Sequence, residues 1–296
     1  MIEGLVTKSH KNIIVDSYND IIEIHPFGDI HWDTEACDRD RFDNDIADMK
    51  KSKNALFLGM GDYLDFLAWS DRKKIKNSGL HDESMNRLHA VSMADITAFR
   101  RRIEFMKGRF IGMIGGNHDW EFPDGKCGTE KLCESLGCEY LGWLSYIKVR
   151  LIKRTSKARS SGITFDIVAC HGKAGGKLPG TSINQVEDLH RLFPAANIYI
   201  MGHDHQRGGW PMASMFASID NYDKHGFTIK EKEQWLCRSG SYMKGYTMGQ
   251  GGYVASKLKR PSNLGKITIR IGIDRHNDPE KGEDYKNCKG RIQVLA

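Results

Sequence analysis

The chain has 296 residues, of which 40% are hydrophobic and 28% are charged, with 44 Lys and Arg against 38 Asp and Glu. These proportions are ordinary for a soluble globular protein, and the net charge of +6 permits an anionic partner without requiring one. No apolar run approaches the roughly 20 residues of a membrane-spanning helix, and the start, MIEGLVTKSHKN, lacks the layout of a signal peptide. We therefore expect a cytoplasmic protein without membrane contact.

The cysteines and the basic runs favour no special chemistry. The seven cysteines are odd in number and include no CxxC pair, which argues against both a disulfide framework and a thiolate zinc site. Two stretches are more basic than the whole chain: KRTSKARSS at 153–161 and ASKLKRPSNLGK at 255–266. Each is typical of a solvated loop or hairpin tip.

Short apolar runs alternate with amphipathic stretches through the first two thirds of the chain. Expected strands are two within residues 12–29, around an SYND turn, and one each in 54–62, 109–116, 163–172 and 197–205. Expected helices cover 41–51, 82–107 and 182–193; in the second, Met85, Leu88, Val91 or Ser92, Ile96, Phe99, Ile103 and Met106 recur at helical spacing and should face the core.

The second half adds further strands, in 139–153, 233–239 and 265–273. Because the earlier runs are apolar without alternation, they suit strands that are buried on both faces. We therefore predict a layered α/β fold, specifically a four-layer α/β/β/α sandwich with two mixed β-sheets, in a single domain over 1–296.

Several of these strands end in glycine and then in polar residues. The strand ends carry Asp29, His31, Asp62, Asn117, His118, Asp119, His171, His203 and His205, which include five of the twelve histidines. In layered α/β folds, ligands collect outside the carboxyl ends of the strands. A lone histidine is more often a satisfied core or surface residue than a ligand, but this recurrence is hard to explain by packing.

Carboxylate, amide and imidazole groups without a thiolate suit divalent Mn, Fe, Zn, Co or Ni better than Ca. Their number exceeds what one ion can use while it keeps positions open for water and substrate. The set therefore indicates two divalent metal ions, with manganese favoured, at the carboxyl ends of the strands. Paired metals about 3.5 to 4 Å apart are the usual arrangement for phosphate-ester hydrolysis.

The ordered set D-x-H, GDxxD, GNHD, H and GHxH, spanning residues 29 to 205, resembles the calcineurin-like metallophosphoesterase superfamily, and within it the phosphodiesterase or nuclease branch. The resemblance implies one metal on Asp29, His31, Asp62 and His205, with Asp62 bridging to a second metal on Asn117, His171 and His203. It also implies attack by a metal-bridging hydroxide, with His118 protonating the leaving oxygen and Asp119 orienting His118.

Of the other acidic residues near these motifs, Asp65 completes GDYLD and has either a supporting role at the site or a structural one. Asp33 and Asp204 are more typical of solvated or helix-capping carboxylates.

Two glycine-rich stretches offer candidate substrate contacts. Lys173 and Lys177 lie in HGKAGGKLPGT at 171–181, where they would approach a phosphate, or else belong to a surface loop. Arg238 and Tyr242 lie in 238–253 and would contact a backbone phosphate and stack on a base, or else form turns between strands. Positive charge together with tyrosine favours a phosphodiester in nucleic acid or a nucleotide as substrate.

Three other functions remain open from the sequence. A phosphomonoesterase is the main alternative within the enzyme class. A scaffold that has lost hydrolysis would be expected to lack His118 or several ligands, and all are present. A plain nucleic-acid-binding protein would not need five ordered ligand motifs, and its binding would persist after metal removal.

Overall fold

The computed structural model describes residues 6–66, 75, 79, 81–154, 162–173, 179–219, 224–246, 261–278 and 282–296. Its strands are β1 (Thr7–Val15), β2 (Ile21–Phe27), β3 (Ala55–Gly59), β4 (Phe110–Met113), β5 (Leu144–Lys153), β6 (Gly162–Cys170), β7 (Ile198–Met201), β8 (Arg207–Ile219), β9 (Phe227–Ser241), β10 (Gly265–Lys266), β11 (Thr268–Asp278) and β12 (Gly282–Leu295). Its helices are α1 (Arg39–Lys51), α3 (Asp82–Ile103), α4 (Gly128–Leu136), α5 (Pro179–Leu192) and the short 3-10 helix η1 (Glu104–Met106).

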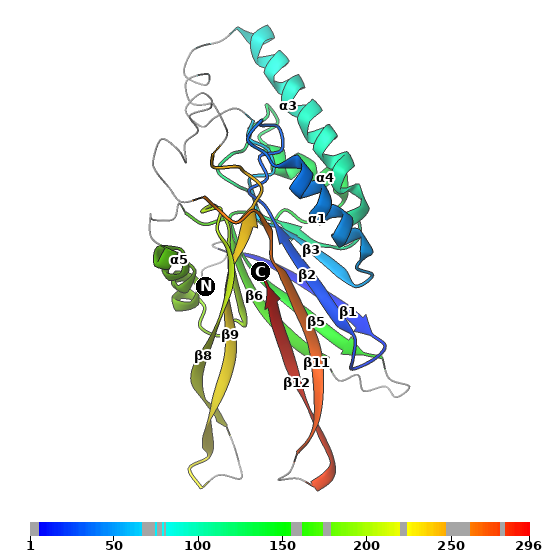
Figure 1. Cartoon of the computed structure of the whole chain (residues 1–296), viewed down its shortest axis with the longest axis vertical. Coiled ribbons are helices and arrows are strands. Elements are labelled where there is room, and N and C mark those ends of the chain that lie inside the picture. Colours follow the sequence, from blue (N-terminus) through cyan, green and yellow to red (C-terminus); the bar gives the residue numbers. More distant parts are fainter. Residues whose placement is uncertain are drawn as a thin grey trace.

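The strands form two mixed sheets (Figure 1). The five-stranded sheet has the order β12-β11-β2-β3-β4, in which β2, β3 and β4 are parallel. The seven-stranded sheet has the order β1-β5-β6-β7-β9-β10, with β8 paired to β9. Within it β6, β7 and β9 are parallel. Each sheet therefore has a parallel part, whose carboxyl ends open onto a common edge.

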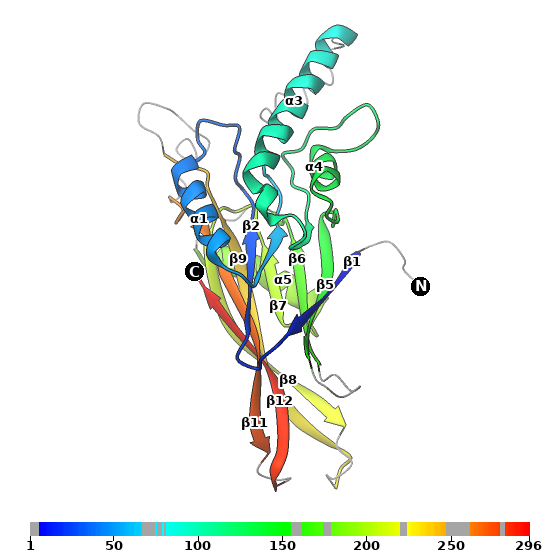
Figure 2. The ribbon, with the colours of Figure 1, turned by 90° about the vertical axis from the view of Figure 1, so that its right-hand side faces the viewer.

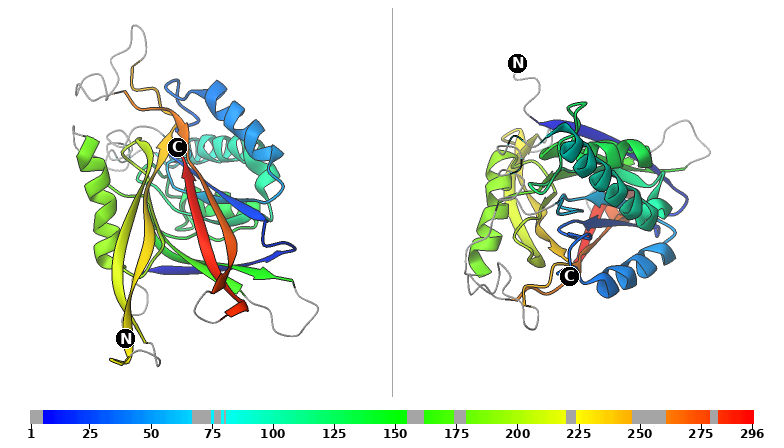
Figure 3. Two further views of the ribbon diagram at one scale, coloured as in Figure 1. Left: turned by 60° about the horizontal axis from the view of Figure 1, so that its bottom comes forward. Right: turned by 90° about the horizontal axis from the view of Figure 1, so that it is seen from above.

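Three apolar clusters hold these elements together. One fills the space between the sheets and includes Ile24, Leu58, Ile167 and Ile200. A second joins the outer face of the five-stranded sheet to α1, α3 and α4, and a third joins the seven-stranded sheet to α5. Figure 3 accordingly shows α5 on the opposite side of the molecule from α1 and α3.

The α/β class, the two mixed sheets and the expected helices and strands are confirmed. In α3, position 92 and not 91 faces the core, because Ser92 is buried whereas Val91 is 58% exposed. The sequence analysis missed α4, β8 and β12.

Two long hairpins, β8–β9 and β11–β12, extend away from the helical end of the molecule (Figures 1 and 2). Near the end of the first hairpin, Met215 and Ile219 are more than four-fifths exposed. Among the described residues, no helix has the length and apolar composition that a bilayer crossing requires.

Candidate metal centre

The expected ligands follow strands of both sheets. Asp29 and His31 come after β2, Asp62 after β3 and Asn117 after β4, in the five-stranded sheet; His171 comes after β6, and His203 and His205 after β7, in the seven-stranded sheet. Because the parallel strands of each sheet end at one edge, the fold brings these loops together. The two sheets thus contribute complementary halves of one site.

The backbone at these residues is strained. Asp29, His31, Asp62, His203 and His205 have positive φ values of 47°, 48°, 49°, 67° and 61°, and Phe66 is the only other non-glycine residue of this kind in the described parts. A side chain with a Cβ enters this left-handed region at a cost, and such residues concentrate at functional sites. Packing alone does not explain why the strain falls on the expected ligands.

Glycines make room for the ligand side chains. A Cβ on Gly116 would overlap Oδ1 of Asp62, and a Cβ on Gly61 would lie 2.5 Å from Nδ1 of His171. Gly61 also has a φ of +94°. Gly61 precedes Asp62 and Gly116 precedes Asn117. Each must be glycine because the side chain of another candidate ligand lies where its Cβ would be.

One group of side chains converges on Nε2 of His171. This atom lies 3.0 Å from Oδ1 of Asn117, 3.1 Å from Nδ1 of His203 and 3.2 Å from Oδ2 of Asp62. Nδ1 of His171 is 2.8 Å from the carbonyl oxygen of Met60, to which it donates, so in the neutral ring Nε2 carries a lone pair. Lone pairs that face one another in this way suit a cation at their centre.

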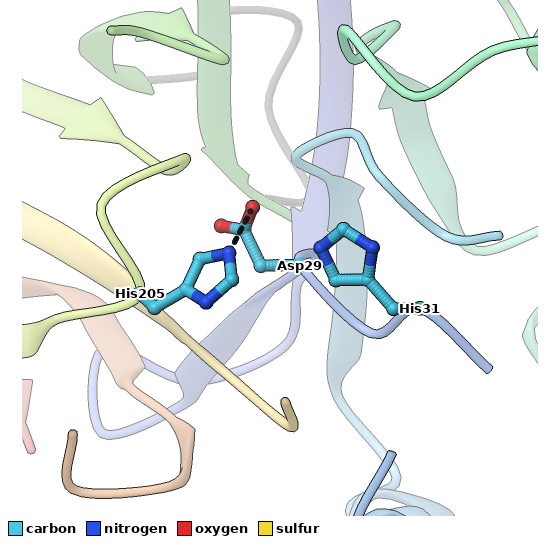
Figure 4. A group of neighbouring side chains, drawn as sticks. All are labelled: Asp29, His31 and His205. Carbon is cyan, nitrogen blue, oxygen red and sulfur yellow. Dashed lines mark ion pairs between the residues drawn. The ribbon is translucent and has the colours of Figure 1, made fainter. Parts of the chain in front are cut away.

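A second group consists of Asp29, His31 and His205, and Figure 4 shows Asp29 between the two imidazole rings. Nε2 of His205 lies 3.6 Å from Oδ1 of Asp29. That oxygen and both ring nitrogens of His31 are buried without a hydrogen-bond partner within the described part of the chain. Buried polar atoms are nearly always satisfied, so these atoms are suited to a ligand that the protein itself does not provide.

Burial and charge act on the two carboxylates in opposite directions. Burial raises the pKa of Asp29 to about 7. Burial would also raise the pKa of Asp62, but the neighbouring His171 lowers that pKa well below its usual range. In turn, burial would lower the pKa of His171, and the Asp62 carboxylate raises it to about 9. The site thus places buried carboxylates beside imidazoles. A divalent cation bound here would replace the protons that these groups hold, because metal ligands must be deprotonated.

His118 pairs with Asp65, and the expectation that Asp119 orients it is wrong. Nδ1 of His118 is in close contact with Oδ1 of Asp65. Oδ1 of Asp119 instead accepts the backbone N–H groups of Trp120 (3.0 Å) and Thr129 (3.1 Å). Asp119 therefore caps the first turn of α4, where free N–H groups need an acceptor.

Asp65 serves two histidines from one carboxylate. Besides contacting His118, its Oδ1 lies 3.6 Å from Nδ1 of His31. Burial would raise the pKa of Asp65, and these contacts hold the pKa well below its usual range. Asp33 fixes the loop, since its carboxylate accepts the N–H of Asp65 at 2.6 Å and that of Phe66 at 2.9 Å. The last position of GDYLD was the sequence signal for Asp65; no pattern marked Asp33 or the Met60 carbonyl as part of the site.

Two of the expected substrate contacts are buried instead. Arg238 is fully buried and donates to the carbonyl oxygens of Ser182 and Gly202. Tyr242 is 1% exposed, and its hydroxyl donates to Asp45 at 2.9 Å. Neither can touch a substrate from this position, because both side chains lie beneath the surface.

The two lysines of the 171–181 stretch differ in what the structure describes. Lys173 is exposed, and its Nζ lies 3.1 Å from Asp188 of α5. Lys177 lies outside the described residues. An exposed lysine that already has a carboxylate partner is no specific indication of a substrate contact.

Taken together, the buried Asp and His groups could hold a metal ion. Comparisons with protein-family models, with curated proteins and with solved structures gave no match to this chain. The function proposed below therefore rests on the geometry and chemistry of the site.

Proposed function

We propose that this protein is a metal-dependent hydrolase of phosphate esters that uses two divalent ions. Asp29, His31 and His205 would hold one ion and Asn117, His171 and His203 the other, with Asp62 between them. Carboxylate, amide and imidazole groups converge here on strained backbone, and Oδ1 of Asp29 and both ring nitrogens of His31 are buried without a hydrogen-bond partner within the described residues; this observation carries the proposal. The mixed oxygen and nitrogen donors favour manganese, with Fe, Zn, Co or Ni as alternatives.

When bound, the ions would lower the pKa of a water molecule and neutralise the charge on the phosphoryl oxygens. His118 supplies the other half of the chemistry, a proton for the leaving oxygen. Its ring is held by Asp65, and its side chain is 22% exposed, so that an ester at the centre can reach it. A histidine held by a carboxylate is a suitable general acid near neutral pH.

The favoured substrate is a phosphodiester of nucleic acid or of a nucleotide. An alkoxide leaving group needs a proton, which fits the His118–Asp65 pair, and the net charge of +6 is compatible with a polyanion. The proposal includes the four-layer arrangement of the superfamily, in which the helices cover the outer faces of two stacked sheets. Phosphomonoester hydrolysis is the outcome that would overturn the preference for diesters.

Chelator-stripped protein should be assayed with bis-p-nitrophenyl phosphate and p-nitrophenyl phosphate before and after manganese is added, with metal content measured by elemental analysis. We expect two ions per chain and metal-dependent turnover that favours the diester. Turnover of the monoester alone would move the activity to the phosphatase class. Two bound ions without any turnover would favour a scaffold.

A further inference from the structure

One long stretch of the sequence has no acidic residue. From Ser239 to Ile273 the sequence contains neither Asp nor Glu, but it contains the basic residues Lys244, Lys257, Lys259, Arg260, Lys266 and Arg270. The segment leaves β9, returns in β10 and continues into β11. Of these basic residues the structure describes three: Lys244, which is paired with Asp38, Arg270, which is paired with Glu23, and Lys266.

Two arginines from other elements meet this segment at Gly265. A Cβ on Gly265 would lie 2.8 Å from Nη2 of Arg41 in α1 and 3.1 Å from Nη1 of Arg207 in β8. Gly265 has a φ of +111°, a conformation that glycine adopts readily. The two guanidinium groups therefore lie side by side against bare backbone.

Only one arginine of this pair, Arg41, has a carboxylate partner among the described residues. Asp45 lies 3.5 Å from Nε of Arg41, but it also accepts the Tyr242 hydroxyl. Within the described parts of the chain, Arg207 forms no ion pair with a carboxylate, and residues 247–260 contain no acid that could provide one. Lys266 follows Gly265 and faces the carboxylates of Asp45, Glu23 and Asp48, so the charge left unpaired among the described residues is that of Arg207.

The pair is accessible and close to the metal centre. The Arg41 side chain is 44% exposed, and Arg207 is partly exposed. Arg207 follows His205 by two residues, so their Cα atoms are at most about 7 Å apart along the chain. A strand whose scissile phosphate lay at the metal centre would thus carry other phosphates within reach of this pair.

We propose that Arg41 and Arg207 form a phosphate-binding site for the backbone of a nucleic-acid strand, beside the metal centre. Two planar guanidinium groups present donor forks that match phosphate oxygens, which a single ammonium group does not. The site deepens the proposed function, on which it rests for its choice of substrate. Arg41 and Arg207 take the place of the buried Arg238 as backbone contacts.

The test is binding of a labelled single-stranded oligonucleotide in excess chelator, measured by fluorescence anisotropy over a range of salt concentrations. We expect Arg41→Gln and Arg207→Gln each to weaken binding at least about tenfold and to reduce the salt slope by about one. Arg207→Lys should keep the slope and weaken binding less, because it keeps the charge without the fork. Arg191→Gln on α5, where Arg191 is 69% exposed, is the matched control and should bind like the wild type.

The proposal would be overturned if both Gln variants kept the wild-type affinity and salt slope. It would also be overturned if Arg191→Gln lost as much affinity as they do. Inorganic pyrophosphate serves as a second probe: if the variants lose its binding and keep the oligonucleotide, the site is not one for a nucleic-acid backbone. Melting curves exclude misfolded variants. The chelator removes metal-dependent catalysis, so this assay measures binding alone. Weaker binding by the variants would therefore support the site even if the wild type hydrolyses no diester.

Discussion

At the residue scale, Asp65 and Asp119 have different functions, although the first lies next to His118 in space and the second follows it in sequence. Asp119 is its neighbour in the chain and binds the backbone of α4, whereas Asp65 reaches it from the loop after β3. Adjacency in GNHD suggested the wrong partner, because side chains of successive residues in a turn point in different directions. The identity of the contact depends on how two distant loops dock.

Substitution of the two carboxylates should separate these functions. Asp65→Asn should lower turnover of an oligonucleotide, whose alkoxide leaving group needs a proton, by up to about 10² to 10⁴-fold, the usual contribution of a general acid, because His118 loses its charged partner. Asp119→Ala should instead cost about 1 kcal/mol of stability through the lost cap and change turnover only a few-fold. Turnover, metal content and urea unfolding, measured for both variants, separate a loss of catalysis from a loss of stability. Equal loss of turnover in the two would contradict the assignment.

A buried histidine away from the centre should make stability depend on pH. Burial, together with the nearby Lys266, lowers the pKa of His25 to about 4 from its ordinary value of 6.5. The folded protein thus keeps this ring neutral, while the unfolded chain takes up a proton below pH 6.5. The contribution is complete above pH 6.5 and is lost as the pH falls toward 4, by about 3 kcal/mol in all.

The free energy of unfolding in urea, measured between pH 4.5 and 7.5, tests this for the wild type and for His25→Gln. Gln keeps a polar group of similar size and does not titrate, so the variant should lose less stability on acidification. The other titrating groups contribute equally to the pH dependence of both chains, so the difference between the two curves reports on His25. Parallel curves would show that His25 does not control this transition.

At the element scale, the loop after β7 is held by a buried ion pair. Nε of Arg238 in β9 lies 3.2 Å from Oδ2 of Asp204, and both side chains are almost fully buried. Asp204 stands between His203 and His205, both of which have strained backbone. The sequence favoured a solvated Asp204, since nothing in GHDHQ shows that an arginine 34 positions later lies against it. The ion pair fixes the loop that presents two histidines.

Breaking this pair from one side should be costly. Arg238→Met should lower the free energy of unfolding by about 3 to 5 kcal/mol, because it leaves the buried Asp204 carboxylate without its charged partner, although the Ser182 hydroxyl and the Gln206 N–H still donate to it. The double variant Arg238→Met with Asp204→Asn should be more stable than the single one. Urea unfolding of the four chains forms a double-mutant cycle, and additive losses would mean that the pair does not couple.

The elements that could be predicted are those with a strong apolar period. The core face of α3 and the parallel strands of both sheets carry such a period, so their residues specify them locally. By contrast, α4 has only nine residues and begins at Gly128, while β8 and β12 mix polar and apolar side chains in long hairpins. Their stability comes from pairing and capping by distant residues, which a sequence pattern does not show.

At the scale of the whole molecule, the proposed centre joins the two sheets, since each provides about half of the candidate ligands. Bound ions should therefore stabilise the entire fold, by about 2.7 kcal/mol per site when the free ion is at 100 times its Kd. Thermal unfolding with manganese and with chelator measures the shift. Asp62→Ala should abolish the shift if this carboxylate serves both ions, and a full shift in that variant would refute its bridging position.

The division of the ligands between two sheets also has a consequence for folding kinetics. Residues 29 and 205 lie far apart in the chain, and their side chains meet in the folded structure, where a common core joins the two sheets. We therefore expect the centre to be completed after the rate-limiting step of folding. In stopped-flow experiments manganese should slow unfolding and leave the refolding rate unchanged. Faster refolding with manganese would instead mean that the ligands assemble before the sheets dock.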